Sequence, residues 1–305
     1  MMFNKRFPTL LLLFIIFGSV SCGKEPLPSI DTLVKEVIET PEAPKYVPQR
    51  LFTMSSFGVQ PFSVNSQGMD IFNDELLFQA GVDNTDIHII SLKEPGVLGY
   101  VSFVTPSGEP CHMNNINCGN KLNSWDTFPL LYLSQTSDSR ACFVLHIFND
   151  AKSYKIIQTI IYKGENHYRN NQAFDWFIDL DNSFIYTYGN VSRGSNKREI
   201  VKFNLPSPSI KDIVLTDQDV IDCFILEDQS VYQGSKIIDG LLYAPVGYGN
   251  SQHPGRLIIV DLNLKVVVED IPISCGEPES IGKYKSGAII CGGGRDPYYY
   301  FIRLQ

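Results

Sequence analysis

Five short polar segments recur along the chain, and their side chains are the ones in this sequence best equipped for chemistry. The segments begin at Gln67, His112, Gln172, Gln233 and Glu277. Successive starts lie 45, 60, 61 and 44 residues apart. Amides and carboxylates of this kind can hold a sugar or another polar ligand when they converge on one pocket. The candidate ligand-binding residues are Gln67, Asp70, His112, Asn114, Asn115, Trp125, Gln172, Asp175, Gln233, Lys236, Glu277 and Glu279.

Carboxylates in this set allow a catalytic alternative. Glycoside hydrolysis needs a general acid and a second carboxylate at a fixed separation, and Asp70, Asp175 and Glu279 could supply them. The competing interpretation is that these side chains only satisfy buried backbone groups and channel water. We assign no catalytic residue, because the sequence has no G-x-S-x-G elbow and no phosphate-binding loop.

The segment from Cys111 to Phe128 is the most unusual part of the chain and is interpreted as an insertion. Long loops in compact folds are disproportionately functional. Trp125 could stack on a sugar ring or pack as core. His112 has no second histidine two or four residues away, so the sequence predicts no metal site and no cofactor.

From about residue 50 the chain consists of short runs rich in Ile, Val, Tyr and Phe. Glycine, proline, asparagine and aspartate separate the runs, which is typical of strands joined by turns. Clear examples are residues 86–92, 141–148, 154–162, 257–262 and 298–304. No long helical period interrupts them, so the sequence predicts an all-β domain over 50–305.

An internal repeat selects the architecture. Residues 67–78 (QGMDIFNDELLF) and 233–243 (QGSKIIDGLLY) share a Gln-Gly start, an apolar pair, an acidic turn and a Leu-Leu-aromatic strand. Their spacing matches the 40–50 residues of propeller blades. We therefore expect a β-propeller of five blades, with six as the alternative. The last unit lacks an outer strand, which residues 50–57 could supply and so close the ring.

The N-terminus indicates export. Lys5 and Arg6 precede an apolar run, LLLLFIIF, that is too short to span a bilayer and suits a signal peptide. The following Ser-Val-Ser-Cys resembles the lipobox of bacterial lipoproteins, with Ser19 where leucine is commonest. That resemblance implies a signal peptide over 1–21 and lipidation at Cys22. Residues 22–49, punctuated by prolines, are expected to form a tether, within which 30–40 could form a short helix.

Charge and cysteine content limit the partners. The net charge of −8 argues against nucleic acid, because binding to phosphates is driven by Lys and Arg. Membrane association is expected through the lipid alone.

Six cysteines follow Cys22. Cys142 and Cys291 are expected to be small buried residues, whereas Cys111 and Cys118 share one segment and could pair.

Residues 50–305 resemble lipoprotein propellers of the WD40-like or YncE-like kind, and in blade number the tachylectin-like propellers. The resemblance is architectural, because the sequence lacks the Trp-Asp dipeptides of WD40 blades and the Asp-box of sialidases. It implies a protein of the bacterial cell envelope, at the periplasmic or surface face of the outer membrane. The expected function is binding of a glycan, peptide or envelope protein, with no catalysis evident. The alternatives are a carbohydrate-active hydrolase and a structural subunit of an envelope assembly.

Overall fold

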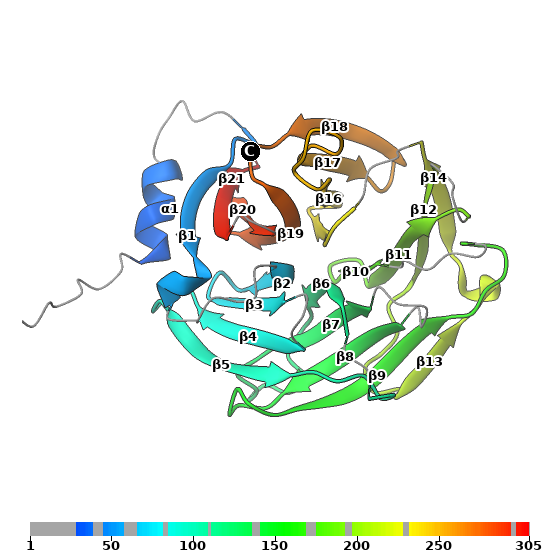
Figure 1. Ribbon diagram of the computed structural model, residues 1–305. Coiled ribbons are helices and arrows are strands. Elements are labelled where there is room, and N and C mark those ends of the chain that lie inside the picture. The colour runs from blue at the N-terminus through cyan, green and yellow to red at the C-terminus, as the bar shows by residue number, and fades with distance from the viewer. Residues whose placement is uncertain are drawn as a thin grey trace, which may run out of the picture.

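The fold is a ring of five sheets around a central axis (Figure 1). The computed structural model describes residues 29–38, 45–57, 66–81, 85–108, 111–135, 141–168, 175–192, 197–227, 232–293 and 297–304. The prediction of an all-β propeller with five blades is confirmed, and the six-bladed alternative is wrong. Within the described residues, no helix has the length and apolarity needed to cross a membrane.

Each blade runs from an inner strand at the axis to an outer strand at the rim. Blade 1 consists of β2 (Ser66–Phe72), β3 (Leu76–Gly81), β4 (Asp86–Ser91) and β5 (Gly96–Ser102). Blade 2 consists of β6 (Met113–Cys118), β7 (Leu130–Gln135), β8 (Ala141–Ile147) and β9 (Tyr154–Tyr162). Blade 3 consists of β10 (Asp175–Asp179), β11 (Phe184–Asn190), β12 (Arg198–Asn204) and β14 (Asp222–Leu226). Blade 4 consists of β15 (Lys236–Ile238), β16 (Leu241–Val246), β17 (Arg256–Asp261) and β18 (Val266–Pro272).

Blade 5 joins the two ends of the propeller. It consists of β19 (Glu277–Tyr284), β20 (Gly287–Gly293), β21 (Tyr298–Arg303) and β1 (Gln49–Thr53). β1 pairs antiparallel with β21, and Phe52 stacks on Tyr299. The expected closure by the N-terminal strand is confirmed, and β1 covers the edge that β21 would otherwise expose.

Blade 2 carries a fifth strand that the repeat does not predict. The chain leaves blade 3 after β12, forms β13 (Asp212–Leu215) parallel to β9, and returns through a 3₁₀ turn, Asp217–Asp219, to β14. Gln158 on β9 holds this excursion, because its amide donates to the backbone carbonyls of Ser207 and Ile210. The excursion accounts for part of the 61-residue interval between the third and fourth repeats.

Tight turns join the inner strands to the second strands. Asn73 and Asp74 after β2, and Asp239 and Gly240 after β15, all have positive φ angles. Two-residue hairpins favour such turns, because their twist matches that of the flanking strands. The acidic turn seen in the repeat is therefore a consequence of hairpin geometry.

Five hydrophobic clusters fill the spaces between neighbouring blades. On β20, successive residues alternate between two of them: Ile289 packs toward blade 1 and Ile290 toward blade 4. Both faces of each central strand are thus covered, which explains the continuous apolar runs in the sequence.

A short helix, α1 (Ile30–Ile38), packs on the outside of the closing blade (Figure 1). The Ser29 hydroxyl accepts from the Thr32 backbone N–H, as expected of an N-cap. Ile30 and Val34, one helical turn apart, are buried in the cluster between blades 5 and 1. Asp31 accepts from the Tyr284 hydroxyl and pairs with Lys285. Part of the proline-punctuated segment is therefore docked on the propeller.

The six described cysteines are free thiols. Cys142 and Cys291 are fully buried, as expected. Cys118 is the last residue of β6 and Cys111 lies two residues before its start, so the extended chain between them spans roughly 20 Å at 3.3 Å per residue. A disulfide needs Cα atoms within about 7 Å, so the suggestion that these two pair is wrong.

Candidate functional site

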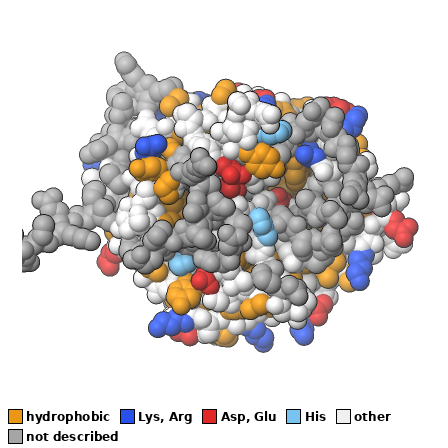
Figure 2. Space-filling model, viewed as in Figure 1, with side chains coloured by type: hydrophobic (Ala, Val, Ile, Leu, Met, Phe, Trp, Pro, Cys, Tyr) orange, Lys and Arg blue, Asp and Glu red, His pale blue; other side chains and the backbone are white. Residues whose placement is uncertain are grey.

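A pocket of about 450 Å³ lies where the inner strands begin, at one end of the channel. Six of the predicted residues line it: Gln67, His112, Asn114, Asp175, Gln233 and Glu277. They come from all five blades, so the convergence expected from the repeat occurs here. On the face seen in Figure 2, acidic, basic, histidine and apolar side chains surround the centre of the ring.

Asp175 opens β10 and is buried. Its Oδ2 accepts from the Asn114 amide at 2.7 Å. Its Oδ1 is also buried, and no described residue hydrogen-bonds to it. Burial raises the pKa of this carboxyl to about 7, against the opposing effect of Asn114 and Ser134. Asp175 therefore offers an unsatisfied polar atom at the pocket and carries a proton in part of the molecules at neutral pH.

Two further carboxyls lie on β19. Glu277 lines the pocket, accepts from the Gln233 amide at 3.3 Å, and has its pKa raised by burial. Glu279 lies deeper, only 2% exposed, against the Cα of Gly293, where any side chain would collide with it. Burial, with a smaller contribution from Glu277, raises the pKa of Glu279 to about 9, so it is protonated at neutral pH. No described residue hydrogen-bonds to its Oε2.

His112 and Gln67 link the first two blades at the pocket. The His112 Nε2 lies 2.9 Å from the Gln67 Oε1. Gln67 also touches Glu279, whose carboxylate form it favours. The predicted residues at this end therefore form three hydrogen-bonded groups around the pocket: His112 with Gln67 and Glu279, Asn114 with Asp175, and Gln233 with Glu277.

Asparagine side chains of β6 fill the middle of the channel. The Asn115 amide donates to the backbone carbonyls of Trp176 and Ser235, each at 3.0 Å, and so connects blade 2 to blades 3 and 4. The Asn117 carbonyl accepts from the Ile178 backbone N–H at 2.9 Å. Asn115 is thus a structural residue of the channel. The segment read as an insertion contains the inner strand β6, and the part after Cys118 is a loop.

Glycine explains the repeated Gln-Gly. A Cβ on Gly68 would lie 2.7 Å from the Met113 carbonyl oxygen, and one on Gly234 would lie 2.6 Å from the Asn114 carbonyl oxygen. Inner strands approach one another here more closely than any side chain allows. The motif therefore combines a pocket residue with a packing requirement.

Asp70 and Lys236 lie toward the other end of the channel. Asp70 is fully buried, and Lys236 lines a second pocket, of about 320 Å³, with Cys118, Asp179 and Lys283. Three residues of strand separate Gln67 from Asp70, which is roughly 10 Å along the axis. The structure therefore does not bring these two together with the residues of the first pocket.

The remaining predicted residues lie elsewhere. Trp125 is 74% exposed in the β6–β7 loop, which follows the far end of the inner strand, and it does not line the pocket. Gln172 and Cys22 lie outside the described residues.

Sequence reasoning missed the aromatic side of the pocket. Tyr188, Tyr232, Tyr248 and Arg198 line it together with the predicted residues. The ring centroids of Tyr188 and Tyr232 are 4.3 Å apart. Tyr232 precedes the inner strand β15. Tyr188, Tyr248 and Arg198 lie at or near ends of β11, β16 and β12, and in an antiparallel blade those ends lie beside the start of the inner strand. That relation is the signal that could have found them.

Among the described residues, the His, Asp and Glu side chains of the pocket do not form a group of three with ligand atoms close enough to hold a metal ion. The pocket combines hydrogen-bond donors and acceptors, among them one arginine and two carboxyls, with tyrosine rings.

Comparisons with known proteins bear on the fold alone. No family model and no curated protein matches the sequence. Two solved propeller structures resemble the chain over 84% of its length. The luciferin-regenerating enzyme is 10% identical, with 95% of that chain covered and a TM-score of 0.48. Glutaminyl cyclase from Myxococcus xanthus is 12% identical, with 96% of that chain covered and a TM-score of 0.49. At such identities and TM-scores the likeness carries no information about activity.

Proposed function

We propose that the protein is a lipid-anchored component of the bacterial cell envelope that binds a glycan in the pocket at the start of the inner strands. The observation that carries the binding proposal is that Asp175 lines the pocket and that its buried Oδ1 has no hydrogen-bond partner among the described residues. Leaving a buried polar group unsatisfied costs about 1–3 kcal/mol. A ligand hydroxyl that donates to this atom would recover that cost.

The composition of the pocket favours a sugar over a purely apolar ligand. Sugars present many hydroxyls that both donate and accept, and the amides of Asn114 and Gln233 and the carboxyl of Glu277 match them. Tyrosine rings supply flat apolar surface for the faces of a sugar ring. A volume of about 450 Å³ is within the range of small-ligand sites.

A hydrolase is the second candidate, and one observation favours it. A carboxyl with a pKa of about 7, as Asp175 has, suits a general acid, and Glu277 supplies a second carboxyl in the same pocket. The three-carboxylate set considered from the sequence is not assembled, because Asp70 is paired with Lys236 at the other end of the channel. Hydrolysis would therefore depend on Asp175 and Glu277.

The anchor proposal rests on the N-terminal sequence. The basic start, the apolar run and the Ser-Val-Ser-Cys motif support cleavage before Cys22 and its lipidation. Eight residues separate Cys22 from Ile30, where the docked helix α1 begins. Such a stretch reaches at most about 28 Å, so an anchored propeller would stay close to the membrane surface.

Binding of the purified protein to a glycan array tests the pocket proposal. We expect Asp175→Asn to abolish a hit, because the amide presents a donor where the ligand needs an acceptor. Trp125→Ala is the matched control, since it removes a large exposed ring away from the pocket, and the hit should survive it. Retention of the hit in Asp175→Asn, or the absence of any hit, would reject the glycan pocket and turn the search toward peptides.

Two further variants address the hydrolase and anchor proposals. Incubation of any bound glycan with the protein, followed by product analysis, decides between binding and hydrolysis, and hydrolysis must fail in Glu277→Gln. Incorporation of labelled palmitate tests the anchor. It should disappear in Cys22→Ser, and its absence from the native protein would reject lipidation.

A further inference from the structure

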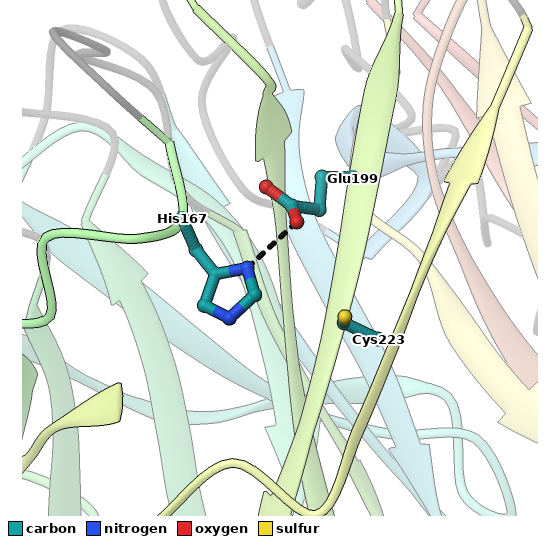
Figure 3. A group of neighbouring side chains, drawn as sticks. All are labelled: His167, Glu199 and Cys223. Atoms are coloured by element: carbon teal, nitrogen blue, oxygen red, sulfur yellow. Dashed lines mark hydrogen bonds and ion pairs between the residues drawn. The ribbon is translucent and has the colours of Figure 1, made fainter. Parts of the chain in front are cut away.

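Three side chains with metal-binding atoms converge on blade 3, away from the pocket (Figure 3). Glu199 belongs to β12, Cys223 to β14, and His167 to the connection between β9 and β10. One ligand atom from each lies within 4.8 Å of the other two. In Figure 3 the imidazole and the carboxylate point toward each other, and the sulfur lies beside both.

The sheet register places two of these residues on one face. β12 and β14 pair antiparallel, with Glu199 opposite Ile225 and Val201 opposite Cys223. Side chains two residues apart share a face, so Glu199 and Cys223 are diagonal neighbours on that face. Arg198, the residue before Glu199, lines the ligand pocket. Because neighbouring residues of a strand point to opposite faces of the sheet, the pocket and the group of three side chains lie on opposite faces of β12.

Buried contacts hold the third residue in place. Tyr168, next to His167, is fully buried, and its hydroxyl donates to the backbone carbonyls of Thr187 and Glu199. Asp217 accepts from the backbone N–H groups of Glu165 and Asn166, which orders the segment leading to His167. These contacts hold the His167 imidazole beside Glu199.

The hydrogen bonds already resemble those around a metal ligand. The His167 Nδ1 lies 2.7 Å from the Glu199 Oε1. The other oxygen, Oε2, accepts from the Tyr168 backbone N–H at 3.4 Å, an outer contact of the kind that orients ligating carboxylates. Glu199 and His167 are 9% and 14% exposed at their side chains, so the pair is shielded from water while Cys223 is open to it.

Carboxylates lie close to the group. Glu199 and Asp222 contribute negative charge at Cys223, which Lys265, the partner of Asp222, offsets in part. Asp217 adds another carboxylate near His167. A divalent cation bound here would be attracted by these carboxylates and would hold the cysteine as its thiolate.

We propose that His167, Glu199 and Cys223 bind a divalent transition-metal ion of the zinc class. An imidazole nitrogen, a carboxylate oxygen and a thiolate sulfur suit Zn²⁺, whereas Ca²⁺ and Mg²⁺ take oxygen ligands. On binding, the ion takes the place of the proton between the His167 nitrogen and the Glu199 oxygen, and that proton and the proton of the Cys223 thiol pass to solvent. Three protein ligands leave one coordination position for water.

A bound ion would fasten the outer part of blade 3. β14 is reached after the excursion through β13 on blade 2, and its side chains alternate between partial burial and exposure. A metal joining β14, β12 and the β9–β10 connection would fix the return of that excursion. We therefore expect saturating Zn²⁺, at about 100 times its dissociation constant, to raise the melting temperature by roughly 5 °C.

Titration of the purified full chain with Co²⁺ tests the site. We expect one Co²⁺ per chain and a near-ultraviolet thiolate-to-cobalt charge-transfer band that Zn²⁺ displaces. Cys223→Ser must remove the band, and His167→Gln and Glu199→Gln should each weaken binding at least tenfold. Cys223 is exposed, so its substitution is compatible with folding, which melting of the metal-free variant checks.

A matched control uses an exposed histidine elsewhere. His253→Gln removes a surface imidazole on blade 4 and should leave both the band and the affinity unchanged. A native chain that gives no charge-transfer band, or a band that persists in Cys223→Ser, would overturn the proposal. Failure of the glycan experiment would leave this result unaffected, because the two sites share no residue.

Discussion

Lys236 on blade 4 lies across the channel from Asp70 on blade 1, and the Lys236 Nζ is 2.5 Å from the Asp70 Oδ2. Blades 1 and 4 are not neighbours in the ring. The Asp70 side chain is fully buried and that of Lys236 is 15% exposed. The backbone N–H groups of Ile71 and Cys118 also donate to the Asp70 carboxylate. The ion pair and these two bonds together satisfy a charge at the centre of the propeller.

Removing the lysine should therefore destabilise the fold. Lys236→Met leaves a buried carboxylate without its cation, and we expect a loss of about 3 kcal/mol in the free energy of unfolding, measured with urea. The double variant Asp70→Asn/Lys236→Met should recover most of it. Lys283→Met, which breaks a surface pair with Asp239, is the control and should cost under about 0.5 kcal/mol. An equal loss in Lys236→Met and Lys283→Met would contradict this account.

Alanine at the repeated glycines should strain the inner strands. A Cβ at Gly68 or Gly234 meets backbone carbonyl oxygens at 2.7 and 2.6 Å, and backbone atoms cannot move aside as a side chain can. We expect Gly68→Ala and Gly234→Ala to lower the free energy of unfolding by about 2 kcal/mol each. Gly96→Ala, whose nearest atom would lie at 3.7 Å, should be neutral. Denaturant melts that show no difference between these positions would reject close packing as the reason for the Gln-Gly motif.

The buried Asp175 should make stability fall as pH rises. Its pKa of about 7 in the folded protein exceeds the ordinary 3.8, so the folded state holds the extra proton. Its contribution is fully present below about pH 4 and is lost as pH rises through about 7. The free-energy difference between Asp175→Asn and the native protein should accordingly shift by about 4 kcal/mol in favour of the variant across that window.

Urea unfolding at several pH values between 4 and 8 measures this shift. Asp181→Asn, in the exposed turn after β10, serves as the control and should parallel the native curve. The native curve should continue to fall above pH 7, because the pKa of Glu279 is raised to about 9. A native protein whose stability rises between pH 4 and 7 relative to Asp175→Asn would refute the raised pKa.

The docking of α1 should depend on its buried face. Val34→Asp places a charge in the cluster between blades 5 and 1, where Val34 is fully buried. We expect the helix to detach and the chain before β1 to become sensitive to protease, while the propeller keeps its melting temperature within about 3 °C. Thr32→Asp adds the same charge on the exposed face and should leave cleavage slow. Equal cleavage rates in the two variants would show that the buried face does not hold the helix.

Much of the strand pattern could be predicted because its signals are local. The predicted run 154–162 coincides with β9, and 86–92 and 298–304 each extend one residue past β4 and β21. These strands alternate or are buried on both faces, which the sequence displays directly. β6 escaped prediction because Asn114, Asn115 and Asn117 disfavour a strand, and only the neighbouring blades supply the partners that make them favourable there.

The site was predicted in part for the same reason. Gln67, His112, Gln233 and Glu277 stand at the starts of repeats, and the repeat brings them to one end of the channel. The tyrosines of the pocket stand outside the repeated motif. The group of His167, Glu199 and Cys223 has no short spacing to reveal it, because 32 and 24 residues separate its members.

The sequence by itself determined the five-repeat β-propeller and its closure by the N-terminal strand, because turns, alternation and repeat length are properties of neighbouring residues. Tertiary structure decided which end of the channel each polar side chain faces. Three residues along an inner strand move a side chain by roughly 10 Å, which is enough to take Asp70 from the pocket of Gln67 to the ion pair with Lys236. Packing between blades, which no local signal records, fixes that depth.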